Sequence, residues 1–229
     1  MSSSKNMEKN ELEIRIAHEF KIDYPESQML NKSEQEKIQN AVNNGGIAIG
    51  SKTYVDSGKL PTLLKTDKKG VNVILNETPE EDIKRIGNKE YLSTPHTLKE
   101  IAKRREQPRP ELDRETLKYS GECIDAFSSN PQLDKERTIE SDRINTERPK
   151  LGKKVINERE PTVSELSGEP LDGTARVHHI IRVADKPEEA LNRDNLVVIR
   201  DDEHKEFHSS DLLQNEEGYE EYKKYIIGK

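Results

Sequence analysis

The chain has little material for a large hydrophobic core. Of its 229 residues only 30% are hydrophobic and 4% are aromatic, tryptophan is absent, and 36% are charged. These proportions argue against a single large core and favour a small compact domain with extended, polar or helical surroundings. The shortage of aromatic rings also argues against a surface that binds single-stranded nucleic acid by stacking.

Cysteine and long apolar runs are also scarce. The one cysteine, Cys123, excludes a disulfide framework within the chain. No apolar run approaches the length of a membrane span, and the opening MSSSKNMEKNELEIR lacks the apolar stretch of a signal peptide. We therefore expect a cytoplasmic location and no membrane partner. A protein exported by a dedicated machine without such a signal would look the same.

A surplus of positive charge is missing too. The net charge is −7, which counts against a protein that coats DNA by charge alone, because non-specific affinity comes from neutralising phosphates. An enzyme that meets one phosphate through a metal and a few arginines remains compatible with this charge.

What the chain does have falls into three segments. Residues 1–127 combine helical patterns with stretches typical of strands; the helical ones include ELEIRIAHEF, SEQEKIQNAV, TPEED and STPHTLKEIAKRRE, and the strand-like ones are IAIGSKTYV and GVNVILN. Residues 128–165 nearly lack apolar side chains and predict a charged, extended linker or arm. Its arginines either contact nucleic acid or remain solvated; they are Arg137, Arg143, Arg148 and Arg159.

Residues 166–229 predict an ordered sequence of elements. RVHHIIRV and DNLVVIR are typical of strands, DDEHKEFHSSDLL of a helix with acids at its start, and EGYEEYKKYII of a closing amphipathic helix. Four of the six histidines of the chain lie within this segment.

The spacing of these four histidines predicts a metal site. His204 and His208 are four residues apart, so a helix presents both imidazoles on one face. His178 and His179 are adjacent on a strand and point to opposite faces, so one can join the metal while the other stays free. Three histidines with an open position are typical of a catalytic metal site. The alternatives are scattered surface histidines and a structural metal clip.

These residues resemble the HNH endonucleases, in particular the colicin-type DNases and the HNH nuclease domains of bacterial toxins. Those domains carry a His-His pair on the first strand, an Asn that opens the second, a His nine residues on and another four later. In this chain the pattern falls on His178, His179, Asn195, His204 and His208, and the lead-in SGEPLDGTARVHH and the loop PEEALNRDNL also look like the family. The resemblance covers about residues 165–210 and does not extend to residues 1–130.

The resemblance implies an α+β fold with a C-terminal ββα-metal finger in residues 166–229. It would follow a mostly helical, partly β N-terminal region of unknown role (residues 1–127) and the extended polar linker. In the implied site His179 is the general base, Asn195 holds the loop and orients His179, and one divalent ion binds to His178, His204 and His208. Nitrogen ligands favour Zn²⁺, Ni²⁺, Co²⁺ or Mn²⁺ over Mg²⁺ in affinity, and the ion that supports turnover stays open.

The chain also departs from the family. Colicin-type enzymes have an acid two residues before the His pair and an arginine six before it, whereas this chain has Arg176 and Asp172 there, with the charges exchanged. Arg176, and Arg182 beside it in the same stretch, are therefore the substitutes we expect for the phosphate contact. There are no Cys-x-x-Cys pairs to bind a second, structural zinc.

The function implied is a metal-dependent DNA endonuclease from a phage or mobile element, a defence system, or a bacterial toxin. Its partners would be DNA and, for a toxin, an immunity or inhibitor protein. Two alternatives remain: a non-catalytic, metal-stabilised module that binds DNA or protein, and an RNase with the same core.

Overall fold

A computed structural model describes residues 13–171, 173–213 and 215–228. The fold is mixed α+β, and the chain divides into two compact units, residues 1–137 and residues 138–229. None of the helices in the described ranges is long and apolar enough to cross a membrane.

An antiparallel sheet forms the centre of the N-terminal unit. Its strands are β1 (Ile14–Ile16), β2 (Gly46–Ile49), β3 (Lys52–Asp56), β4 (Ile83–Ile86) and β5 (Lys89–Ser93), in the order β1-β2-β3-β5-β4. The two middle strands, β3 and β5, pair with Val55 opposite Leu92. Both of these side chains are fully buried, so one face of the sheet carries the core.

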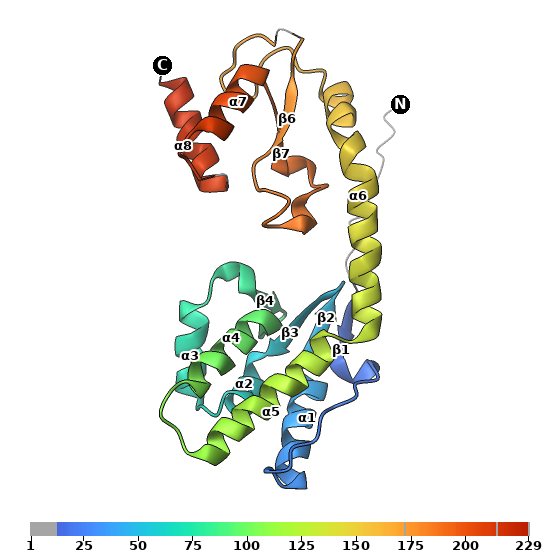
Figure 1. Cartoon of the computed structure of the whole chain (residues 1–229), viewed down its shortest axis with the longest axis vertical. Coiled ribbons are helices and arrows are strands. Elements are labelled where there is room, and N and C mark those ends of the chain that lie inside the picture. The colour runs from blue at the N-terminus through green and yellow to red at the C-terminus, as the bar shows by residue number, and fades with distance from the viewer. Residues whose placement is uncertain (1–12, 172, 214, 229) are drawn as a thin grey trace. The chain divides into compact units, whose positions relative to one another are not determined.

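Helices gather on one side of this sheet (Figure 1). They are α1 (Lys32–Gly45), α2 (Leu60–Leu63), α3 (Lys68–Glu77), α4 (Thr94–Arg105) and α5 (Glu111–Ser128). Side chains at their starts accept hydrogen bonds from backbone N–H groups that have no partner within the helix, as Asn31 does for α1, Asp67 for α3 and Ser93 for α4. Leu117 and Ile124 of α5 are fully buried against the sheet residues in one continuous core.

The N-terminal unit contains an internal repeat. The segments IGSKTYV (residues 49–55) and IGNKEYL (residues 86–92) each form the end of one strand, a tight turn and the next strand. Gly50 and Gly87 occupy equivalent turn positions with φ of 57° and 59°, a conformation that favours glycine. Because Val55 pairs with its own counterpart Leu92, the two hairpins are related by an approximate two-fold axis through the centre of the sheet.

The structure differs from several sequence predictions in this unit. The stretch GVNVILN (residues 70–76) lies in helix α3 and not in a strand, because Val71 and Ile74 are three apart and share its buried face. Residues 14–16 form strand β1 within the predicted helical stretch, pairing with β2. TPEED yields only a 3₁₀ turn, Glu80–Asp82, before strand β4.

The predicted extended linker is also wrong in its conformation, because the structure forms helix α6 (Pro131–Arg159) across it. Ile144, Leu151 and Val155 recur at helical spacing and are buried, although the segment has few other apolar residues. Exposed ion pairs between near neighbours line the helix, such as Arg143 with Glu140 and with Glu147.

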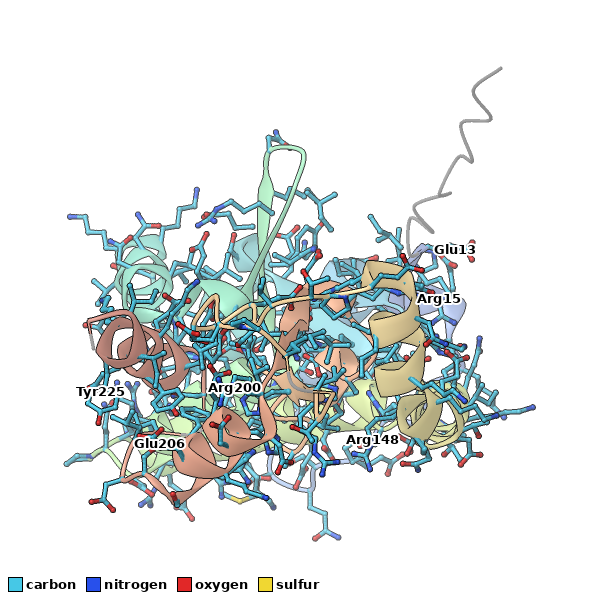
Figure 2. The ribbon with its side chains drawn as sticks, turned by 90° about the horizontal axis from the view of Figure 1, so that it is seen from above. Glu13, Arg15, Arg148, Arg200, Glu206 and Tyr225 are labelled. Carbon is cyan, nitrogen blue, oxygen red and sulfur yellow. The ribbon has the colours of Figure 1, made fainter. Side chains whose placement is uncertain are left out.

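Three of the four arginines predicted to be solvated or to contact nucleic acid are held within the chain. Arg137 donates to the carbonyls of Ser51 and Ser128, Arg143 is ion-paired as above, and Arg159 donates to the carbonyls of Leu196 and Arg193. Arg148, labelled in Figure 2, is exposed on α6.

A pair of strands, the end of α6 and two further α-helices form the described core of the C-terminal unit. Strands β6 (Arg176–His179) and β7 (Leu196–Ile199) pair in antiparallel fashion, followed by α7 (Asp201–Ser209) and α8 (Glu216–Ile227). One apolar cluster joins α7 and α8 to the strands, with Phe207, Tyr219 and Tyr222 at its centre. A second cluster packs the end of α6 against them through Leu151, Val155, Leu196 and Val198. The sequence predicts that this unit begins at residue 166. Its packing begins earlier, within α6.

Candidate metal centre

The strand pair sorts the two adjacent histidines to opposite faces. A Cβ added at Gly152 of α6 would lie 3.7 Å from Val177, so the face of β6 that carries Val177 is turned toward α6. His179, two residues further along the strand, lies on this same face. His178 points the other way, toward α7, and its ring packs edge-on against Phe207 with 5.2 Å between the ring centroids. The two adjacent histidines therefore point to opposite faces of the strand, as the sequence predicts.

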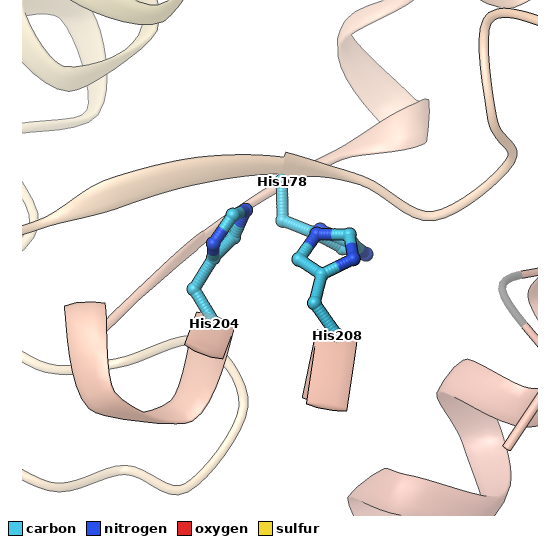
Figure 3. Close-up of side chains that lie close together, drawn as sticks. All are labelled: His178, His204 and His208. Carbon is cyan, nitrogen blue, oxygen red and sulfur yellow. The ribbon is translucent and has the colours of Figure 1, made fainter. Parts of the chain in front are cut away.

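Three imidazoles converge on the α7 side (Figure 3). One ligand nitrogen from each of His178, His204 and His208 lies within 4.8 Å of the others. His178 comes from β6, and the other two come from successive turns of α7, with ring centroids 4.5 Å apart. These residues could hold one metal ion, and they are the set that the HNH resemblance implies.

Burial and charge favour neutral, metal-ready rings. Burial, followed by the neighbouring His204 and His208, lowers the pKa of His178 to about 4. Burial and His208 also lower the pKa of His204. Since a metal binds the neutral imidazole, protons compete weakly for these two ligands at neutral pH.

An unpaired nitrogen supports the same interpretation. His178 is 6% exposed, and its Nε2 atom is buried without a hydrogen-bond partner in the described part of the chain. A buried polar atom left without a partner is costly, and a metal ion would satisfy it. Tyr219 stacks on the same ring with centroids 6.2 Å apart, so two aromatic side chains wall the site on the protein side. His208 is exposed, which leaves an open side.

Hydrogen bonds fix the helix that carries two of the histidines. The buried carboxylate of Glu203 accepts from the backbone N–H of Arg200 at 2.9 Å and from the hydroxyl of Ser164 at 2.6 Å. Tyr222 of α8 donates to the Glu203 carbonyl at 3.3 Å and to Glu206 at 3.1 Å. The first turn of α7 is thus tied to both the preceding loop and the closing helix, which sets the direction of His204 and His208.

His179, on the other face, has a partner that determines where its proton lies. Its Nε2 atom is 2.9 Å from the carbonyl oxygen of Ala190. A carbonyl only accepts, so Nε2 must carry the hydrogen, and the neutral ring keeps its lone pair on Nδ1. His179 also contributes to the low pKa of His178, so the two rings interact electrostatically.

Asn195 organises the loop that contains Ala190. Its side-chain amide donates to the carbonyls of Ile181 (3.0 Å) and Glu189 (3.1 Å), and its oxygen accepts from the Ile181 N–H (2.7 Å). The residue is 5% exposed. Asn195 therefore acts on His179 through the loop, by holding the backbone next to Ala190, and no direct bond between the two side chains is seen among the described residues.

Arg176 lies on the same strand face as His178, two residues before it. Its Nε atom donates to Asp201 at 2.6 Å, and Asp201 also pairs with Lys205 at 2.5 Å. Lys205 and Arg176 together lower the pKa of Asp201 to about 2. Asp172, which stands where colicin-type enzymes have an arginine, lies outside the described residues. The guanidinium of Arg182 lies 3.7 Å from Asp185.

The residues that the sequence analysis missed are those that shape the site without binding an ion. Phe207, Tyr219 and Tyr222 wall and brace it, and Asp201 holds Arg176. The three-residue spacing of the tyrosines was visible in the closing helix as part of its apolar face. The Ala190 carbonyl is a backbone group and leaves no signal in the sequence.

Comparison with family models, with curated proteins and with solved structures finds no match to this chain. Its site must therefore be interpreted from its own residues.

Proposed function

We propose that β6, β7 and α7 form a ββα-metal finger of the HNH type and that the protein is a metal-dependent endonuclease acting on DNA. The proposal rests on the different surroundings of the two adjacent histidines, His178 and His179. His178 joins two helix histidines in a group suited to one ion, while His179 is held by a carbonyl with its lone pair on Nδ1.

The donor set suits a divalent transition metal. Three neutral imidazoles favour Zn²⁺, Ni²⁺, Co²⁺ or Mn²⁺ in affinity, with Mg²⁺ the weaker binder. When bound, the ion would neutralise negative charge on the attacked phosphate and on the departing 3′-oxygen.

The remaining roles belong to side chains. His179 accepts a proton from the attacking water through Nδ1, a task suited to an imidazole. Asn195 keeps the loop in the shape that orients His179. Arg176, 61% exposed in its side chain, is available to contact a phosphate oxygen in exchange for its bond to Asp201. The expected products carry 5′-phosphate and 3′-hydroxyl ends.

A plasmid-nicking assay across several divalent ions tests the proposal, with His179→Ala as the control for the proton acceptor. We expect nicking that requires metal and that falls sharply in the variant. Absence of nicking with every ion tested would contradict the proposal. Parallel assays on labelled RNA and DNA of the same sequence would reveal an RNase with the same core.

One observation favours the second candidate, a metal-stabilised module without catalysis. His178 is buried among Phe207 and Tyr219 as part of an apolar cluster, as in a site whose metal supports the fold. The same nicking assay separates the two, because a structural module binds metal and leaves the plasmid intact.

A further inference from the structure

The first copy of the internal repeat ends in two helices joined by a short turn. Helix α2 and helix α3 are connected by residues 64–67. Leu63, Leu64, Val71 and Ile74 from this segment are buried in the core of the N-terminal unit. One face of α3 is therefore fixed in place, and its opposite face is presented rigidly to the surroundings.

That opposite face carries a distinctive set of side chains. Lys69, Asn72, Val73 and Asn76 follow the spacing of neighbours on one side of a helix, and all four are exposed. Val73 has 53% of its surface exposed. None of the four side chains makes a hydrogen bond or ion pair with another described residue. Two free carboxamides, an ammonium group and a pair of methyl groups are thus available together.

The second copy of the repeat is a natural comparison. Its last helix, α5, exposes charged residues that satisfy one another: Lys118 lies 3.8 Å from both Glu115 and Glu122. The corresponding helices of the two copies therefore differ in their exposed surfaces. The exposed Lys118 of α5 is ion-paired with its neighbours, whereas the four α3 side chains have donors and acceptors without a partner among the described residues.

We propose that the exposed face of α3 reads the edges of base pairs in the major groove of duplex DNA. A carboxamide can pair with adenine through two hydrogen bonds, a lysine with guanine, and an apolar side chain with the methyl group of thymine. A helix fits the width of the major groove, and the second of two helices joined by a tight turn is a frequent way to place it there.

The charge near this face suits the same partner. Lys68 and Lys69 stand together at the start of α3, and no acidic side chain among the described residues is paired with either. In a chain with a net charge of −7, a local pair of free lysines can meet phosphates without general attraction to DNA. The inference rests on the proposed function for its partner, duplex DNA, but it concerns recognition by a different unit.

Selection from duplex oligonucleotides with a randomised central segment tests this inference. The full chain would carry His179→Ala, which retains the three metal-site histidines and prevents cutting under the proposed function. We expect one sequence motif to be enriched. The double variant Asn72→Ala/Asn76→Ala should bind that motif at least about tenfold more weakly, with its affinity for unselected duplex little changed. Lys69→Gln should weaken binding to both.

Matched variants control for the loss of an exposed amide or ammonium group elsewhere. Asn157→Ala on α6 and Lys118→Gln on α5 should leave binding to the motif unchanged, and circular dichroism should show that each variant stays folded. The inference is overturned if no motif is enriched, or if the double variant binds the motif as tightly as its parent. Protein partners of α3 would give the first of these results.

Nicking by the unmodified chain separates this inference from the proposed function. Metal-dependent nicking without an enriched motif leaves the proposed function standing and removes the role of α3. An enriched motif lost in the α3 variant, without nicking under any ion, supports the role of α3 and removes the nuclease.

Discussion

The two units of the molecule are stabilised in different ways. In the N-terminal unit 21 buried apolar residues form one continuous cluster between the sheet and its helices. In the described part of the C-terminal unit, two smaller clusters of buried apolar residues, one of five and one of four, lie on opposite faces of a two-stranded sheet. The larger of these clusters borders the three converging histidines.

This difference teaches where a metal matters for folding. A two-stranded sheet is marginal unless further elements pack on it, and small cores often need a metal or a disulfide as support. The N-terminal unit is stabilised by its buried apolar side chains, so we expect its stability not to depend on metal. In the C-terminal unit the candidate metal site borders the core, and we expect the unit's stability and its chemistry to change together.

The largest expected effect concerns the two adjacent histidines. His178→Ala removes a ligand, so both metal binding and nicking should be lost. His179→Ala removes the proton acceptor, so metal should still bind while nicking falls by about 10²–10⁴. Calorimetry with Zn²⁺ and the nicking assay measure the two properties.

A histidine of the other unit serves as the control for these variants. His96, which lies 3.1 Å from Asp82 in the N-terminal unit, can be replaced by alanine without changing either property. Loss of metal binding in His179→Ala as complete as in His178→Ala would mean that we have exchanged the two roles.

Removal of metal should open one unit and not the other. A ligand present at about 100 times its Kd contributes about 2.7 kcal/mol to stability. A chelator should therefore raise the rate of proteolysis within residues 173–213 by about a hundredfold, where cutting follows the population of opened molecules.

Cys123 reports on the N-terminal unit in the same experiment. It is fully buried, and burial raises the pKa of its thiol to about 12, so at pH 8 almost no thiolate forms and alkylation should be very slow. Cys123 should stay unreactive in chelator and react in denaturant. Alkylation that begins on chelation would show that the two units unfold together.

A smaller effect is expected from the amide that holds the loop. Asn195→Ala removes the hydrogen bonds of the side-chain amide to two carbonyls and one N–H, which should lower the free energy of unfolding of the C-terminal unit by about 1–3 kcal/mol. Nicking should fall further than this loss of stability explains, while Zn²⁺ affinity stays unchanged. Asn192→Ala, in the same loop but exposed, should have little effect on either. Equal effects of the two variants on nicking would argue against a role of Asn195 in positioning His179.

The smallest expected effect compares one tyrosine hydroxyl from each unit. Tyr222→Phe removes the bonds to Glu203 and Glu206, and Tyr119→Phe removes a bond to the Pro25 carbonyl and one from Gln39. Each should cost about 1 kcal/mol in urea unfolding. Only Tyr222→Phe should also weaken Zn²⁺ binding, because Tyr222 braces the helix that carries two ligands. Equal metal affinity in both variants would show that this brace does not matter.

The sequence predicted the metal-site elements well because their patterns are local. A strand alternates its side chains and a helix repeats every fourth residue, so spacing brought together His204, His208 and one of the two strand histidines, and the HNH resemblance selected His178 as that one. Helices α1, α7 and α8 and strands β6 and β7 were predicted for the same reason. The partner of Arg176 was not predictable, because Asp201 is 25 residues away and pairs with it only once the strands align.

The N-terminal unit was harder to predict because tertiary packing decided between local alternatives. The valines and isoleucine of α3 favour a strand by composition, and the need to bury Val71 and Ile74 against the sheet favours a helix. Strand β4 directly follows TPEED, whose helix-start signal favours a helix over a strand at this point. The repeated IG-x-K-x-Y pattern would have predicted both hairpins. In α6 the apolar residues are few, which favours an extended segment by composition, whereas the helical spacing of Ile144, Leu151 and Val155 favours a helix with one buried face.

The hydrogen bond between His179 and the Ala190 carbonyl has a consequence for how this protein can vary. Because the acceptor belongs to the main chain, no amino-acid substitution at position 190 other than one that moves the backbone can delete it. The tautomer of His179 is therefore insulated from point mutation at its own contact. It is exposed instead to insertions and deletions between residues 180 and 195, which alter the path of the loop. Within this loop, Asn195 apart, chain length should be held more strictly than residue identity.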